Sequence, residues 1–241
     1  MKWGKIIFII YVISFLILIA LQVQAHPDWN LNWSLIALGL ALLSIFGFLG
    51  YWENKRHSTK EIALLATLSA IAALGRVPFA VIPNVQPTTF LVIISGYVFG
   101  PGAGFAVGAL AALTSSFFLG LGPWTPWQMV AWGLAGLTAG LWRHFGKNLS
   151  RLLLLIFAVL WGYFYGLIMN TWHWLTFIYP LTWQTFTATY AAAIWFDTLH
   201  GVGNGVFMWF MGRELIRVME RFKNRLQVEY LKVDELKEES I

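Results

Sequence analysis

The sequence predicts an all-α, polytopic integral membrane protein, and three observations lead to that prediction. Hydrophobic residues make up 59% of the 241-residue chain and charged residues only 11%, whereas soluble domains carry about 25% charge. The apolar residues gather in runs that are mostly long enough for helices to cross a hydrocarbon core of about 30 Å. The basic residues fall almost entirely into alternate loops between those runs. These observations exclude a soluble domain, so the net charge of +5 does not indicate a nucleic-acid partner.

Eight apolar segments are candidates for membrane helices. They cover approximately residues 6–24, 33–52, 60–75, 88–99, 102–121, 127–142, 151–170 and 186–212. Strands are not expected, because an open sheet edge is not tolerated in lipid and the period-two alternation of a barrel is missing. The segment 88–99 is too short to cross a bilayer unaided. We expect it to tilt, to break, or to extend into the Pro-rich stretch before it.

The positions of the basic residues predict the orientation of the chain. When the loops are numbered alternately, every Lys and Arg except Arg76 falls on one side. Lys and Arg in short loops are retained on the cytoplasmic side of a membrane. The sequence therefore predicts about eight spans with both termini in the cytoplasm.

Two changes in composition divide the chain into three parts. A polar linker follows Trp52 and separates an N-terminal two-helix hairpin, residues 1–53, from a six-helix core, residues 58–212. After the core, apolar residues recur at helical spacing among basic residues. This pattern favours an amphipathic helix on the inner membrane face, so residues 213–241 are predicted to be a cytoplasmic tail; a solvated tail is the alternative.

The first apolar segment could instead be a signal peptide. Lys2 and Lys5 precede it, and residues 23–25 (Val-Gln-Ala) fit the small-residue rule for cleavage. The apolar run is longer than the usual signal core, so we expect a retained anchor.

Small residues form flat faces on several predicted helices. Ala66, Ala70 and Ala73 lie at i, i+4 and i+7, which predicts either internal packing or a surface for a partner subunit. Gly104 and Gly108, and likewise Gly136 and Gly140, repeat this spacing. For these glycines we expect internal packing.

Two rigid outer loops carry candidate ligand-binding residues. In the first, Pro78, Pro83 and Pro87 prevent a continuous helix, and irregular backbone at the membrane usually lines or covers a cavity. The loop's polar groups are Arg76, Asn84 and Gln86, which either contact a bound molecule or stabilise a connection.

The second outer loop, at residues 120–128, presents Trp124, Trp127 and Gln128 at a helix entry. The indoles are either part of an interfacial aromatic belt or stack on a planar ligand.

The last core helix has a polar stripe of Asp197, His200 and Asn204 on one face. Polar groups at membrane depth generally face a cavity or a partner. One interpretation is a simple pair between Asp197 and His200. The other is the wall of a ligand site, with Asn170 and His173 on the neighbouring helix as companions.

The core resembles the substrate-binding S component of energy-coupling factor (ECF) vitamin transporters. The resemblance covers roughly residues 58–212 and depends on four features. They are the Ala-rich first core helix after a basic linker, PNVQPTT at residues 83–89, SGYVFGPGAG at residues 95–104 and GPWTPWQM at residues 122–129. The N-terminal hairpin departs from the family pattern.

The resemblance implies a six-helix protein that binds a vitamin or precursor near its outer face, under the first outer loop. It also implies partners, namely a transmembrane coupling subunit and two cytoplasmic ATPases. Ala66 and Ala70 would contact the coupling subunit, and Ala73 would extend that face. The sequence has no phosphate-binding loop, which agrees with a passive binding subunit driven by its partners. No cofactor, no metal site and no enzymatic activity are expected.

The ligand class is the least determined prediction. The segments PNVQ and GPWTPW resemble S components assigned to cobalamin or related corrinoids, and amides with indoles suit a large planar ligand. Other vitamins or heterocyclic precursors are the alternative. Two alternatives come from other classes of protein. Ser95 and His200 loosely resemble the dyad of an intramembrane serine protease. A structural or assembly protein is the third possibility.

Overall fold

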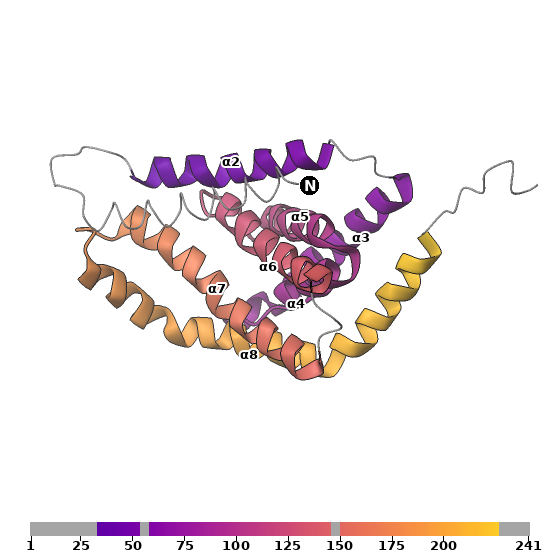
Figure 1. Cartoon of the computed structure of the whole chain (residues 1–241). Coiled ribbons are helices and arrows are strands. Elements are labelled where there is room, and N and C mark those ends of the chain that lie inside the picture. Colours follow the sequence, from indigo (N-terminus) through magenta and orange to yellow (C-terminus); the bar gives the residue numbers. More distant parts are fainter. Residues whose placement is uncertain (1–32, 54–57, 146–149, 227–241) are drawn as a thin grey trace, which may run out of the picture.

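The structure, a computed structural model, describes residues 33–53, 58–145 and 150–226, and this part of the chain is helical throughout apart from its connections. It contains seven α-helices and one short 3-10 helix, labelled as in Figure 1. Their bounds are α2 Trp33–Glu53, α3 Thr59–Arg76, η1 Pro78–Val81, α4 Thr88–Phe99, α5 Pro101–Leu119, α6 Thr125–Phe145, α7 Arg151–Phe177 and α8 Trp183–Leu226. The all-α prediction is confirmed for these residues.

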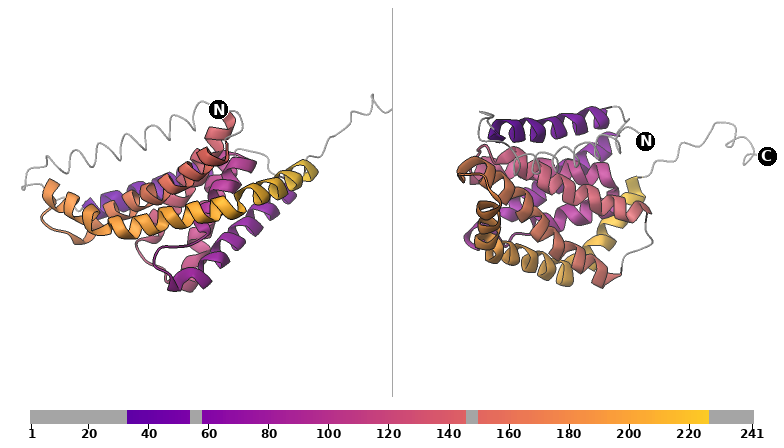
Figure 2. Two further views of the ribbon diagram at one scale, coloured as in Figure 1. Left: turned by 90° about the horizontal axis from the view of Figure 1, so that it is seen from below. Right: turned by 60° about the vertical axis from the view of Figure 1, so that its left-hand side comes forward.

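The helices form two packed groups with α2 laid across them. Helices α3, α4, α5 and α6 make one cluster, in which α5 and α6 contact each other most extensively. Helices α7 and α8 run side by side in opposite directions as the second group (Figures 1 and 2). Contacts from α4 to α8 and from α6 to α7 join the groups, and α2 packs on α6 and α7.

Helix α4 lies inside the bundle, which explains how so short a helix fits a membrane protein. Its 12 residues span about 18 Å at 1.5 Å per residue. Ten of them are buried, with α3, α5, α6 and α8 as neighbours. The expected extension into the Pro-rich stretch is wrong, because that stretch forms the separate helix η1. A helix enclosed by protein need not match the thickness of the hydrocarbon core.

The glycines of α4, α5 and α6 bring three backbones into contact. A Cβ added at Gly104 or at Gly136 would overlap the backbone of the other residue, and one at Gly96 would overlap Gly136. Gly108 faces the Trp132 backbone in the same way, and Gly140 faces Pro101. The prediction that these glycines serve internal packing is confirmed.

By length and composition, three described segments qualify as membrane spans, Thr59–Val81, Pro101–Leu119 and Arg151–Phe177. Helix α4 is apolar but shorter. Helices α7 and α8 both continue past their expected ends. The first predicted span, residues 6–24, lies outside the described residues, as do the proposed cleavage site and residues 227–241 of the predicted tail.

Helix α8 is a single helix of 44 residues, about 66 Å long, and it bends in its later part (Figure 1 and Figure 2, right). After the predicted boundary at residue 212 it packs back on the core through the buried Met219. Lys223 Nζ donates to the Val98 carbonyl at the end of α4 at 2.6 Å. Glu220 pairs with Arg143 of α6 at 3.1 Å. These contacts explain why the helix does not stop at residue 212.

Candidate functional site

A buried polar network lies where α3 ends and α4 and α6 begin, and Arg76 connects its parts. Arg76 Nε donates to Gln86 Oε1 of the Pro-rich loop at 2.9 Å. Its Nη1 donates to Ser115 Oγ of α5 at 2.9 Å, and the guanidinium lies 4.9 Å from the ring centroid of Trp132 in α6. One cation therefore joins α3, the loop, α5 and α6.

The network continues through Thr89 to the last helix. Trp132 Nε1 donates to Thr89 Oγ1 at 2.8 Å, and the same oxygen lies 2.7 Å from His200 Nε2. A hydroxyl can accept one bond and donate or accept a second, so both tautomers of His200 are compatible with this contact. The His200 ring also packs edge to face on Tyr165 of α7, with 4.7 Å between centroids. All six core helices thus meet at this cluster.

Three buried polar atoms in this region find no hydrogen-bond partner among the described residues. They are Gln128 Oε1, His200 Nδ1 and Asn204 Oδ1. Most buried polar groups in folded proteins are satisfied by protein or by ordered water. The three unpartnered atoms on α6 and α8 can therefore form hydrogen bonds with a polar ligand or with bound water.

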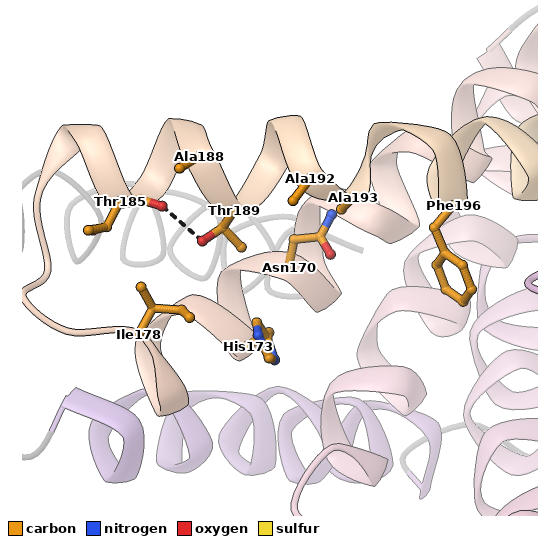
Figure 3. A pocket seen from close by; sticks show the side chains of 9 residues that line it. All are labelled: Asn170, His173, Ile178, Thr185, Ala188, Thr189, Ala192, Ala193 and Phe196. Atoms are coloured by element: carbon orange, nitrogen blue, oxygen red, sulfur yellow. Dashed lines mark hydrogen bonds between the residues drawn. The ribbon is translucent and has the colours of Figure 1, made fainter.

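A groove of about 520 Å³ lies between α7 and α8. Figure 3 shows its nine lining side chains, which come from the end of α7, the residue after it and the first half of α8. They are Asn170, His173, Ile178, Thr185, Ala188, Thr189, Ala192, Ala193 and Phe196. The groove is largely apolar because three alanines and Phe196 form much of its α8 wall. Its volume is within the range of about 300 to 1,000 Å³ that is typical of small-molecule sites.

Asp197 lies beyond the groove on the same face of α8 as Ala193, four residues earlier. Its Oδ2 accepts a hydrogen bond from Asn170 Nδ2 of α7 at 2.8 Å. Its side chain occupies the space that a Cβ on Gly166 would fill. Of the two interpretations of the stripe, the simple pair between Asp197 and His200 is wrong, because the two side chains bind different helices, α7 and α4 respectively.

The polar stripe of α8 faces the protein interior, since Asp197, His200 and Asn204 are 6%, 3% and 0% exposed. Asn204 Nδ2 donates to the Ala158 carbonyl of α7 at 3.3 Å. The stripe therefore contacts α4 and α7 rather than lipid. Whether these side chains bind a ligand stays a prediction.

The loop residues take different positions. Asn84 adopts a left-handed conformation (φ 57°), which Asn tolerates better than most residues. Its Nδ2 donates to the Phe196 carbonyl at 2.9 Å, so the Pro-rich loop is attached to α8 beside the groove. Gln128 is buried near Tyr165.

The two indoles of the second loop differ in exposure. Trp127 is 2% exposed and belongs to a hydrophobic cluster with Trp174. Its ring is covered by protein and has no free face for a ligand in this conformation. Trp124 is half-buried and packs edge to face on Trp172, with 6.2 Å between centroids.

The alanine face of α3 is only partly available. Ala66 is exposed and Ala70 half-buried, but Ala73 is 0% exposed. Ala73 packs inside the bundle and does not extend the exposed face. The surface that remains for a partner is therefore centred on Ala66 and Ala70.

The sequence analysis missed Thr89, Trp132 and Tyr165, which connect the network. Thr89 follows Thr88 at the start of an otherwise apolar helix, and Trp132 lies about two turns inside α6 rather than at its end. Neither position gave a clear signal, because a Thr or a Trp in an apolar helix has the same local pattern whether it faces lipid or a neighbouring helix. The small α8 residues that line the groove gave no signal.

The protease interpretation is wrong. Ser95 Oγ donates to the Leu91 carbonyl of its own helix at 2.8 Å, while His200 Nε2 bonds to Thr89. Serine and histidine thus have separate partners, and a nucleophile activated by a base requires a bond between the two.

Comparison with known proteins agrees with a membrane-embedded binding subunit. The family "ECF transporter, substrate-specific component" matches residues 60–211. A UPF0397 protein of Vibrio atlanticus (strain LGP32) is 27% identical over 96 residues, which are 38% of this chain and 52% of the relative. A UPF0397 protein of Aliivibrio fischeri (strain MJ11) matches with the same identity and coverage. The chain thus spans about half the length of the curated relatives it matches. No solved structure matches it.

The helical fold and the family match together define a class, a multi-pass protein of the cytoplasmic membrane that serves as a transporter's binding subunit and is not an enzyme. Because the family match covers more than half of the chain, the protein belongs to the substrate-specific S components of ECF transporters.

Proposed function

We propose that this chain binds a vitamin or vitamin precursor outside the cell and delivers it to an ECF-type ABC importer. The observation that supports this most is the adjacency of two features within residues 60–211. One is a buried polar network with three unpartnered atoms, and the other is a groove of about 520 Å³ whose wall residue Phe196 lies about one helical turn before His200 on α8. The network offers hydrogen bonds and the groove offers apolar contact, which together suit a small heterocyclic molecule.

The proposed topology has about eight spans and two cytoplasmic termini, divided into the hairpin 1–53, the core 58–212 and the tail 213–241. Its support is the side-specific distribution of every Lys and Arg except Arg76. In this orientation Arg76 and the ligand site face outward. The contacts of Lys223 and Arg143 lie on the cytoplasmic side.

The proposed partners are a transmembrane coupling subunit and two cytoplasmic ATPases, with the exposed Ala66 and half-buried Ala70 as the contact on α3. Replacing both alanines with Trp should abolish co-purification of the partners, because bulky rings prevent close approach of helix backbones. Ligand retention should be unchanged. Ile71→Trp is the matched control, since Ile71 is 50% exposed on another face of the same helix.

This experiment tests the proposed function directly. Wild-type protein that brings down neither ATPases nor a coupling subunit would contradict the importer assignment. Association that survives the Ala66→Trp and Ala70→Trp changes would instead contradict the contact surface.

For the ligand we propose cobalamin or a related corrinoid, on the resemblance of residues 83–86 and 122–127 to corrinoid S components. The groove favours a second candidate, a smaller vitamin or heterocyclic precursor, because its volume is typical for drug-sized molecules. Mass spectrometry of small molecules extracted from detergent-purified protein distinguishes them. A red or pink preparation indicates a corrinoid, and a colourless preparation with a smaller bound compound rejects it.

A further inference from the structure

Asp197 is an isolated acidic residue in the membrane-embedded core. It is the only Asp or Glu between residues 62 and 213, and its side chain is buried in the first half of α8. A carboxylate at membrane depth is energetically costly unless a cation or several donors compensate it, and such residues generally mark ligand or ion sites.

The protein itself provides little compensation for this carboxylate. Within residues 33–53, 58–145 and 150–226, the ion pairs are Arg143 with Glu220 and Arg217 with Glu214, so Asp197 is in neither. Arg76, the cation of the buried polar network, is engaged by Gln86 and Ser115. The Asn170 amide is the hydrogen-bond donor that Asp197 does have.

Space for the carboxylate is built into the helix pair. Gly166 of α7 faces Asp197, and a Cβ at Gly166 would overlap the carboxyl group. One turn further along α7, Asn170 donates to the carboxylate. The missing side chain of Gly166 leaves space for the carboxyl group, and the Asn170 amide fixes its position between the two helices.

This carboxylate adjoins the groove. Asn170 both lines the groove and donates to Asp197, and Phe196, its neighbour in sequence, forms part of the wall. In Figure 3 the Asn170 side chain points from α7 into the space beneath α8, with His173 and Phe196 on either side of it. A ligand in the groove would therefore lie against Asn170, whose amide is bonded to the Asp197 carboxylate.

We propose that the ligand of this subunit carries a cationic nitrogen group, such as a protonated amine, an amidinium or a charged aminoheterocycle, which Asp197 recognises from the end of the groove. The inference rests on the proposed function, since it assumes that the chain binds a small molecule there, and of the two proposed ligands it favours the smaller heterocyclic compound over a corrinoid. The positive charge of the ligand would neutralise the Asp197 carboxylate, which has no ion-pair partner among the described residues. The rings of Phe196 and His173 provide planar faces, and a cation over an aromatic face is further stabilised. The site discriminates against anions and against neutral molecules of equal shape.

The test compares wild type, Asp197→Asn and Glu214→Gln in detergent. Asp197→Asn keeps the side-chain shape and removes the charge. Glu214→Gln makes the same change at an exposed carboxylate that pairs with Arg217. Extracted small molecules are identified by mass spectrometry. We expect wild type and Glu214→Gln to retain one compound with a basic nitrogen, and Asp197→Asn to retain it at least roughly tenfold less.

A second test uses two added probe compounds, so it does not require that a natural ligand stays bound during purification. Benzamidine is cationic at neutral pH, and benzamide is a neutral molecule of nearly the same shape. In a thermal-shift assay at millimolar concentration, we expect benzamidine to raise the Tm of wild type and of Glu214→Gln, but not of Asp197→Asn. Benzamide should raise none of them.

Equal effects of the two probes on wild type, or equal effects of benzamidine on wild type and Asp197→Asn, would overturn the inference. So would a retained compound without a basic nitrogen. These results leave the proposed function standing, because a bound molecule and co-purified ATPases support it separately. Absence of both would instead overturn the proposed function.

Discussion

The helix pairs α5–α6 and α7–α8 are joined in opposite ways. Helices α5 and α6 meet through glycines, with the backbone of Gly104 against that of Gly136. Helices α7 and α8 also cross closely at Gly162 and Gly201. Toward the end of α7, however, polar side chains connect them, among them Asn170 to Asp197 at 2.8 Å.

The difference explains where a ligand can enter. Glycine contacts bring helix axes close and leave no space between them. Side-chain bridges hold two helices at a greater separation, and the groove lies along this bridged part of α7–α8. The first pair therefore forms a closely packed frame, while the second supplies the groove of the proposed ligand site.

The largest expected effect comes from breaking the glycine contact. Gly136→Leu places a branched side chain against the Gly104 backbone, which cannot rotate away as a side chain can. We expect a loss of more than about 3 kcal/mol, at or above the usual range for overpacked cores. Fluorescence-detected size-exclusion chromatography should show aggregated or absent protein. Gly39→Leu is the control, because a Cβ there meets nothing within 4 Å. A well-folded Gly136→Leu protein would contradict the close backbone contact between α5 and α6.

A smaller and more selective effect is expected at Gly166. The clash of Gly166→Ala is with the Asp197 side chain, which can rotate, and Ala favours a helix over Gly by up to about 1 kcal/mol. The thermal stability should therefore change little, while ligand retention should fall roughly tenfold as the carboxylate is displaced.

The double variant of Gly166→Ala with Asp197→Asn checks this reasoning. Because both changes act on one carboxylate, the double variant should lose little more retention than the stronger single variant. Fully additive losses, measured by quantitative mass spectrometry, would show that the two residues act independently.

The smallest effect is expected at a peripheral bridge of α7–α8. The hydroxyls of Tyr163 and Thr198 lie 3.1 Å apart on an exposed surface of the pair. Tyr163→Phe removes this bond alone and should cost about 0.6 kcal/mol, the average for hydrogen bonds between membrane helices. Reversible unfolding in mixed micelles measures the change; a loss above about 2 kcal/mol would assign this bridge a much larger role.

Sequence reasoning predicted the described helices well where their own composition defines them. The expected segment 88–99 coincides with α4, and the expected segment 60–75 is close to α3, Thr59–Arg76. It failed at the ends of α7 and α8. Helix α8 continues because Met219 and Lys223 find partners on the core, and those partners come from distant parts of the chain.

The candidate site shows the same division. Asp197, His200 and Asn204 were recognisable because polar residues on one face of an apolar helix are unusual. Thr89 and Trp132 were not, since a Thr or a Trp in an apolar helix has the same local pattern whether it faces lipid or a neighbour. Their bond requires α4 and α6 to be in register.

The sequence by itself determined that this chain is helical and membrane-embedded, which residues are too polar to face lipid, and which glycines allow close packing. These properties follow from the transfer free energy of side chains and from helix geometry, which depend on local sequence alone. Only the tertiary structure decided that Asp197 binds Asn170 rather than His200, that Ala73 is covered while Ala66 is open, and that the groove lies between α7 and α8. Those outcomes depend on the relative position of helices distant in sequence, and that position is set by packing of the whole bundle.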